Sequence, residues 1–428
     1  MTSRFASDAK RGMPWLVVAG VLVAAMSLRG PIAAPTPVLR AIEDDLGIGS
    51  ATAGLLTTAP VLMFAVLTPV AALVIRRAGA ELALLLSLSG VLVGSVVRAL
   101  PGFGWMLTGM LVIGAAITVG NVVVPVIIRR DVPPERVGVV TAAYVAMLNA
   151  GSLLTTLLTA PIAAVIGWPA ALLVWSAITL GGIALWSVHL ARSRRAGAAP
   201  GERDSGEPAP AGPDRGPDRD AAALTGPLPV VSGRRRERPM LRRPVAWLLM
   251  AAFAGQTTIF YALSTWLPTF SADELGLSAS AAGALASIFQ GAAIAGAFLV
   301  PLLTRYARPL VPALTICASW IVLTVGMLLA PELTWLWLVI GSVGHAGGFV
   351  VVFTALVAVA RDDAEAAGMS AFVQGGGYAI AALGAPFAGW LHELTGGWTA
   401  ALVSFVVLAV VYSATLLAAV AASHRQTR

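Results

Sequence analysis

The chain has 428 residues, of which 58% are hydrophobic and only 11% are charged. A soluble protein of this size carries about 25% charged residues, so the composition excludes an ordinary soluble enzyme or binding domain. The net charge of +7 does not indicate a nucleic-acid-binding protein, because the basic residues lie in breaks between long apolar runs, as in a polytopic helical membrane protein.

Twelve apolar segments follow one another along the chain, each close to the ~20 residues that a membrane-spanning helix needs. The first segment is too long for the hydrophobic region of a signal peptide, and no small-residue cleavage site closes it, so we expect it to remain in the mature protein. In chain order the predicted segments are 14–38, 50–75, 81–100, 104–128, 137–166, 168–190, 244–270, 279–303, 309–329, 333–360, 367–391 and 398–422.

A long polar stretch separates the sixth segment from the seventh. It is rich in Arg, Asp, Pro and Gly and poor in apolar residues, a composition typical of disordered chain. The sequence therefore predicts an N-terminal six-helix bundle over 1–190, a disordered basic cytoplasmic linker over 191–243 and a C-terminal six-helix bundle over 244–428.

The basic residues also predict the orientation of the chain. With the N-terminus placed in the cytoplasm, nearly all of the 28 lysines and arginines fall in cytoplasmic tails and loops, as membrane proteins prefer. The exceptions are Arg29 within the first segment, and Arg40 and Arg98, which we expect near the outer face. The pattern indicates a multi-pass protein of the inner (plasma) membrane with both termini in the cytoplasm.

Short matches relate the two halves of the chain at nearly the same offset. The stretch 46–54 resembles 275–283, 112–120 resembles 339–347, and the pair Ala160-Pro161 resembles Ala385-Pro386. Their shared order indicates two six-helix halves of the same topology, in parallel orientation. In the last register Asn149 corresponds to Gln374.

Several motifs, spread over the whole chain apart from its tails and linker, carry a resemblance to a known family. They are Leu28-Arg29 with Pro31, the stretches 53–58 and 98–102, Gly120-Asn121 with Pro125, Arg130-Asp131, the stretches 260–263 and 266–268, Phe289-Gln290, Gln374 and the stretch 392–398. With two parallel halves, the chain resembles the major facilitator superfamily, and within it the cyanate and 2-nitroimidazole transporter family. The resemblance implies twelve transmembrane helices around a central substrate site.

One loop departs from the superfamily pattern. The inner loop between the second and third helices usually reads Gly-x3-Asp-Arg-x-Gly. Here Ala72 is followed by Arg76, Arg77 and Gly79, so Arg76 stands where the Asp is usual. The charge network of the inner gate therefore lacks its usual carboxylate.

Arg29 is the residue around which the functional prediction is built. It lies roughly 22 Å along the first helix, in a hydrocarbon core about 30 Å thick. A charge at this depth costs about 2.5–3.5 kcal/mol on insertion scales, so a helix that only spanned the membrane would carry Leu there. We expect Arg29 to face a wet cavity and to meet an anion. The alternative is a packing role, in which Arg29 bonds the carbonyls freed by Pro31, Pro35 and Pro37.

The resemblance also nominates the other site residues, because the first, fourth, seventh and tenth helices line the cavity in this superfamily. For each residue the alternative is simple hydrogen bonding between helices. The expected substrate-binding residues are Arg29, Asn121, Gln256, Tyr261 and His345, with Gln290, Asn149 and Gln374 on the next ring.

None of the 21 acidic residues falls in the middle of a predicted span. Proton-coupled transporters generally relay the proton through a buried Asp or Glu, and this chain offers none. His345 is the one central titratable group besides Arg29, so it could couple transport to protons. A neutral histidine bonded between helices is the alternative.

No pattern in the chain indicates an enzyme. There is no Walker loop, no dinucleotide-binding fingerprint after a strand, no H-E-x-x-H and no CxxC, and Cys317 is the single cysteine. The sequence therefore predicts no catalytic residue, metal site or cofactor.

We expect a monomeric secondary transporter that moves a small anion or small polar planar solute, cyanate-like or nitroimidazole-like, by alternating access. Its expected partners are the substrate and the lipid bilayer, with protons as a coupling candidate and no nucleic acid. Two alternatives stay open: a proton-coupled multidrug or metabolite efflux pump, and a non-transporting membrane sensor on the same fold. The sequence leaves open the substrate, the direction and the coupling ion.

Overall fold

The computed structural model describes residues 14–198, 243–306, 310–360 and 363–426, and in these ranges the regular structure is entirely helical. Eleven helices in the described ranges are long and apolar enough to cross a membrane. The predicted span over 367–391 is the one that no single helix fulfils, because it is broken into two helices.

The first half of the chain follows the predicted segments closely. Gly79 and Gly167, each with a φ of 81°, connect consecutive helices in a backbone conformation that other residues rarely adopt. The elements are α2 (Trp15–Ala33), η1 (Thr36–Val38), α3 (Leu39–Leu46), α4 (Ser50–Ala78), α5 (Ala80–Val97), α6 (Phe103–Asp131), α7 (Pro134–Ile166), α8 (Trp168–Val174) and α9 (Ser176–Ala198).

The second half contains the broken span. Pro386 has no backbone N–H to bond the carbonyl four residues earlier, and its ring clashes there, so the helix stops at Ala381 and restarts at Gly384. The elements are α10 (Pro244–Leu275), α11 (Ala279–Tyr306), α12 (Leu310–Leu329), η4 (Pro331–Leu333), α13 (Thr334–Val359), α14 (Asp363–Ala381), α15 (Gly384–Thr395) and α16 (Thr399–Gln426).

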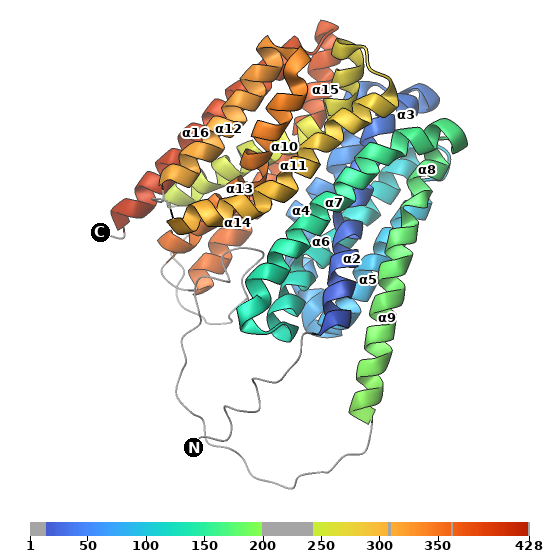
Figure 1. The fold of residues 1–428 in the computed structure, drawn as a ribbon, viewed down its shortest axis with the longest axis vertical. Coiled ribbons are helices and arrows are strands. Elements are labelled where there is room, and N and C mark those ends of the chain that lie inside the picture. Colours follow the sequence, from blue (N-terminus) through green and yellow to red (C-terminus); the bar gives the residue numbers. More distant parts are fainter. Residues whose placement is uncertain (1–13, 199–242, 307–309, 361–362, 427–428) are drawn as a thin grey trace.

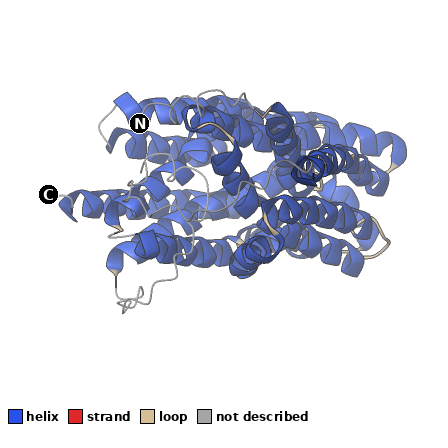
Figure 2. Ribbon diagram, turned by 90° about the horizontal axis from the view of Figure 1, so that it is seen from below, coloured by secondary structure: helices blue, strands red, loops and turns tan. Residues whose placement is uncertain are grey.

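The two halves lie side by side and meet along four long stretches of chain. Figure 1 shows α2 to α9 (blue to green) beside α10 to α16 (yellow to red), and Figure 2 shows the helices running along a common long axis. Across the interface α7 packs along α11, and α4 packs along α14 and α15. The halves approach at the end that carries η1, α3 and α15, here called the closed end, and diverge toward the opposite, open end.

Glycines allow the two halves to approach closely at the closed end. A Cβ on Gly54 would lie 2.7 Å from the backbone nitrogen of Pro386, and one on Gly283 would lie 2.6 Å from the carbonyl oxygen of Thr156. These contacts join α4 to α15 and α7 to α11. Any larger residue at these positions would push the halves apart.

Polar contacts also join the halves there. The Thr265 hydroxyl donates to the Thr57 hydroxyl at 2.8 Å, and the backbone N–H of Ala51 donates to the Glu393 carboxylate at 3.0 Å. The carboxylate thereby bonds a free N–H group in the first turn of α4. Arg40 and the Asp273 carboxylate add an ion pair.

Arg98, which the sequence places near the outer face of the membrane, is fully buried within the protein, at 0% exposure. Its guanidinium donates to the carbonyl of Pro31 at 2.5 Å and to the carbonyl of Leu172 at 3.2 Å. The Pro31 carbonyl is free because Pro35 has no N–H to donate to it. The structural role that the sequence left open for Arg29 therefore belongs to Arg98 at Pro31.

An ion pair lies near the C-terminal end of α4, where Arg76 stands at the position that the superfamily usually gives to Asp. Glu81, in the first turn of α5, pairs with Arg130 near the end of α6 at 2.5 Å, and Arg130 also forms two hydrogen bonds with Asp131, at 2.7 and 2.8 Å. This cluster links α5 to α6 within one half. Arg76 contributes no ion pair within the described ranges.

Helix α9 runs to Ala198, past the predicted bundle boundary at 190. The extra residues are mostly Ala and Arg, which have high helix propensity. The rest of the predicted linker, 199–242, lies outside the described residues. The division into two bundles and a disordered linker stays a prediction.

Arg98→Ala should destabilise the first half, because two buried carbonyls would lose the side-chain donor that Arg98 supplies. The expected cost is about 2 kcal/mol or more, seen as a lower apparent Tm of the detergent-solubilised protein in thermal melts followed by size-exclusion chromatography. Arg136→Ala, at an exposed arginine, is the matched control and should leave Tm unchanged. An Arg98→Ala protein as stable as wild type would contradict the role assigned to these bonds.

Candidate functional site

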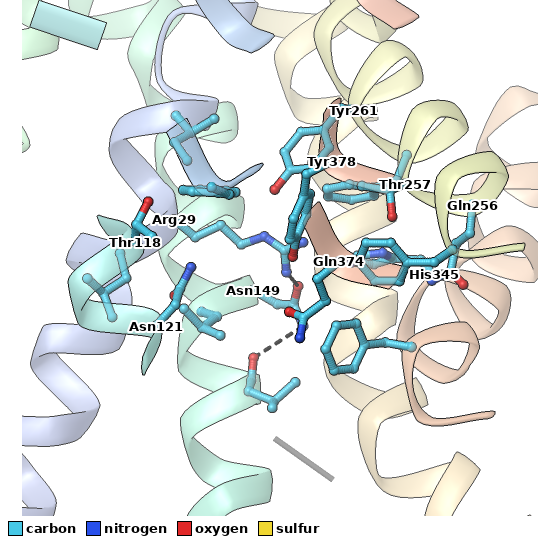
Figure 3. A pocket seen from close by; sticks show the side chains of 18 of the residues that line it. Arg29, Thr118, Asn121, Asn149, Gln256, Thr257, Tyr261, His345, Gln374 and Tyr378 are labelled. Atoms are coloured by element: carbon cyan, nitrogen blue, oxygen red, sulfur yellow. Dashed lines mark hydrogen bonds between the residues drawn. The ribbon is translucent and has the colours of Figure 1, made fainter. Parts of the chain in front are cut away.

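A cavity of about 260 Å³ lies between the two halves. Helices α2, α4, α6 and α7 line it from the first half, and α10, α13 and α14 from the second. Its volume is at the lower limit of ordinary ligand pockets, which suits a solute of few atoms. Thr68 and Tyr144 are among its polar side chains, and Figure 3 labels the others, which are Arg29, Thr118, Asn121, Asn149, Gln256, Thr257, Tyr261, His345, Gln374 and Tyr378.

Arg29 reaches from α2 across the cavity toward the second half. Its Nη1 donates to Oδ1 of Asn149 at 3.0 Å, and its guanidinium carbon lies 4.7 Å from the ring centre of Phe260. Among the residues that the structure describes, no Asp or Glu lines the cavity and Arg29 has no carboxylate partner. The cavity therefore holds one uncompensated positive charge.

Asn149 holds the guanidinium in place. The side chain is only 2% exposed, and its Nδ2 donates to the carbonyl of Val145 at 3.2 Å, which turns Oδ1 toward Arg29. An amide can supply both a donor and an acceptor, so it anchors the cation without neutralising it.

Aromatic rings form the opposite wall. Phe260 and His345 stack face to face, with ring centres 4.1 Å apart and planes 4° from parallel, and Phe289 packs behind both. Flat apolar walls beside a few polar groups are typical of sites for planar ligands. The aromatic lining residues are Phe64, Tyr144, Phe253, Phe260, Tyr261, Phe349 and Tyr378.

The structure brings all but one of the predicted site residues to this cavity, from α2, α6, α7, α10, α13 and α14. Gln290 is the exception: it is buried in α11, at 4% exposure, and does not line the cavity. In α11 the neighbouring Phe289, not Gln290, reaches the ring of His345. The sequence shows that Gln290 lies in the middle of a helix, but not whether its side of the helix faces the cavity.

Two of the predicted glutamines are held by their surroundings. Gln374 donates to the Ser370 hydroxyl at 2.8 Å, one turn earlier in α14. The Gln256 amide rests against Gly348, where any side chain would overlap it, and its buried Oε1 has no hydrogen-bond partner among the described residues. A buried acceptor without a donor is costly.

Sequence reasoning missed most of the aromatic wall, including Phe260, Tyr144 and Tyr378. An aromatic residue in a membrane helix reads equally well as core or lipid contact, so no local signal marked these three. The sequence places Asn149 on a second ring around the cavity, whereas in the structure it bonds Arg29 directly. The repeat register pairs it with Gln374, and the structure places both on the cavity, one from each half.

Proteins of similar sequence agree with this architecture. The chain is 28% identical to the 2-nitroimidazole transporter of Escherichia coli K12, over 92% of this chain and 93% of that protein. It is 27% identical to an uncharacterized transporter of Bacillus subtilis 168, over 94% and 92%. The cyanate transport protein CynX of Escherichia coli K12 is 23% identical, over 87% and 89%.

Solved structures support the fold. A bacterial homologue of the human lysosomal transporter Spinster superposes with a TM-score of 0.67 in an inward-facing unoccupied state, at 16% identity and with 95% and 96% of the two chains covered. The sequence profile of the Major Facilitator Superfamily matches residues 17–373. The predicted all-helical fold and the absence of enzymatic activity are thereby confirmed. The chain belongs to the Major Facilitator Superfamily and is a multi-pass membrane transporter.

Proposed function

We propose that this protein is a secondary transporter of a small planar anion, or of a small polar planar solute, and that the solute binds beside Arg29. The observation that carries the proposal is the guanidinium facing a cavity of about 260 Å³ with no carboxylate partner among the described residues. Such a charge, removed from bulk water, is costly to leave unpaired. An anion in the cavity would supply the missing partner.

Shape and chemistry favour a planar anion. The guanidinium offers several N–H donors in one plane, which match two acceptor atoms of a flat anion. The stacked Phe260 and His345 rings add an aromatic wall. The side chains of Asn121 and Gln256 also line the cavity, which supports a solute with a polar edge. The names of two relatives, a 2-nitroimidazole transporter and a cyanate transport protein, support the same class of small planar solute.

Alternating access between the two halves is part of the proposal. The halves are joined by glycine contacts and polar bonds at the closed end and diverge at the other. The arginine bias in the loops supports placing the open end in the cytoplasm of an inner-membrane protein. With the open end on the cytoplasmic side, the conformation described here exposes the site to the cytoplasm.

The absence of carboxylates from the described cavity lining weighs against the proton-coupled efflux pump. Pumps of that kind relay protons through buried Asp or Glu, whereas the one titratable imidazole here lies flat on Phe260. A hydrophobic cationic drug would also meet the positive charge of Arg29. An anion carrier is therefore the better-supported function.

Arg29→Gln should abolish uptake of radiolabelled cyanate into proteoliposomes, because the positive charge of the site is lost. Arg29→Lys, which keeps the charge but not the planar set of donors, should retain part of the activity at a raised KM. Arg136→Gln, the same change at an exposed arginine, should transport like wild type. Uptake by Arg29→Gln at the wild-type rate would remove Arg29 from the binding site.

Asn149→Asp tests whether the unpaired charge is what attracts the solute. The new carboxylate would lie against the guanidinium and compete with an external anion, so anion affinity should fall about tenfold or more, while the two side chains remain similar in size. Asn149→Ser, which adds no charge, is the control and should weaken binding less. Thermal shifts with increasing cyanate measure both affinities, and equal affinity in the two variants would argue against the charge model.

Gly283→Leu should hold the closed end apart, because its side chain would meet the Thr156 carbonyl of α7. We expect slow transport and an increased reactivity of a cysteine introduced at Thr265 toward a membrane-impermeant maleimide, in a Cys317→Ser background. Gly138→Leu, at a position with open space around it, is the matched control. Unchanged labelling in Gly283→Leu would contradict the assigned interface.

A further inference from the structure

The Arg29 side chain is a link between the two halves as well as a feature of the site. It belongs to α2 of the first half and bonds Asn149 of that half, yet its guanidinium carbon lies 4.7 Å from the centre of the Phe260 ring in the second half. A cation over an aromatic face is attracted by the ring, more strongly where water is excluded. The cavity therefore contains an attraction between the two halves.

Both ends of this link are fixed within their own half. On one side Asn149 is buried and bonded to the Val145 carbonyl. On the other, Phe260 is 6% exposed and lies flush on His345, with Phe289 behind it. Asn149 is fixed in the first half and the Phe260–His345 stack is fixed in the second. A relative movement of the two halves would therefore change the contact between Arg29 and Phe260.

Other polar contacts between the halves lie elsewhere. The Arg40–Asp273 ion pair, the Thr265–Thr57 hydrogen bond and the bond from Ala51 to Glu393 are at the closed end, and none of these residues lines the cavity. Because these polar contacts lie outside the cavity, a bound solute does not touch them. The rings of Phe64 and Tyr378 also meet across the cavity, with centres 5.5 Å apart, but neither carries a charge that an anion could neutralise. The Arg29–Phe260 contact is inside the cavity, so a bound solute can weaken it.

We propose that the protein is an exchanger: its empty form is held by the Arg29–Phe260 contact and reorients slowly, and a bound anion releases that contact. This inference rests on the proposed anion transport. The anion takes up the guanidinium donors and neutralises its charge, so the attraction to the ring falls. The loaded carrier then reorients faster than the empty one, and outward movement of one anion is tied to inward movement of another.

The proposal predicts a difference between two fluxes in proteoliposomes. Radiolabelled cyanate should exchange against unlabelled cyanate inside the vesicles about tenfold faster than it enters empty vesicles. A tenfold ratio corresponds to about 1.4 kcal/mol, within the range for desolvated cation–π contacts. Radiolabelled 2-nitroimidazole serves as a second probe, and protein-free vesicles give the leak for each.

Phe260→Leu should raise entry into empty vesicles toward the exchange rate, because the ring is lost and an apolar side chain remains. Phe260→Tyr keeps the ring face and should retain the wild-type ratio. Phe405→Leu makes the same change at a phenylalanine of α16 that is buried to a similar extent, 5% exposed, but does not line the cavity, and should also retain it.

The outcomes separate this inference from the proposed function. If wild type carries cyanate equally fast into empty and loaded vesicles, the exchanger is refuted while anion transport stands. A Phe260→Leu protein with the wild-type ratio also refutes it. If neither probe crosses in either mode, the proposed function fails, and the exchanger with it. Because the wild-type ratio alone is decisive, a poorly folding variant does not prevent the test.

Discussion

A single guanidinium, held between the two halves of a membrane protein with no carboxylate partner in the described residues, determines how the rest of the site is built. The low dielectric of the bilayer makes such a charge costly unless donors, acceptors and water surround it. Here a buried amide orients it, an aromatic face covers it, and the cavity beside it gives space for a solute. In our two proposals, the same charge selects an anion and holds the halves together when no anion is bound.

The two buried arginines show that depth in the membrane alone does not define a role. Arg98 lies against backbone carbonyls exposed by a proline and by a helix end, and its donors are used for stability. Arg29 has one amide partner, and the rest of its surroundings is cavity and ring. Which carbonyls or spaces a guanidinium meets is decided by how the helices pack.

Much of the fold could be predicted from sequence because hydrophobic length, loop charge and the repeat depend on local composition. Tertiary packing decides the details that sequence patterns do not contain: the break before Pro386, the continuation of α9 through Ala198, and the full burial of Arg98. The polar part of the site was largely predicted, since polar residues are rare in membrane helices. Its aromatic wall was not, because Phe260 and Tyr378 resemble any other apolar membrane residues until helices from both halves are brought together.

The most direct measurement is to locate an anion in the protein itself. Selenocyanate is a small linear anion related to cyanate, and its selenium gives an anomalous signal in crystals. The account predicts one dominant selenium peak in the central cavity, with the anion in contact with the Arg29 guanidinium, and its loss in Arg29→Gln crystals. Anion density away from Arg29 in a protein that transports the anion, or a peak unchanged in Arg29→Gln, would contradict it.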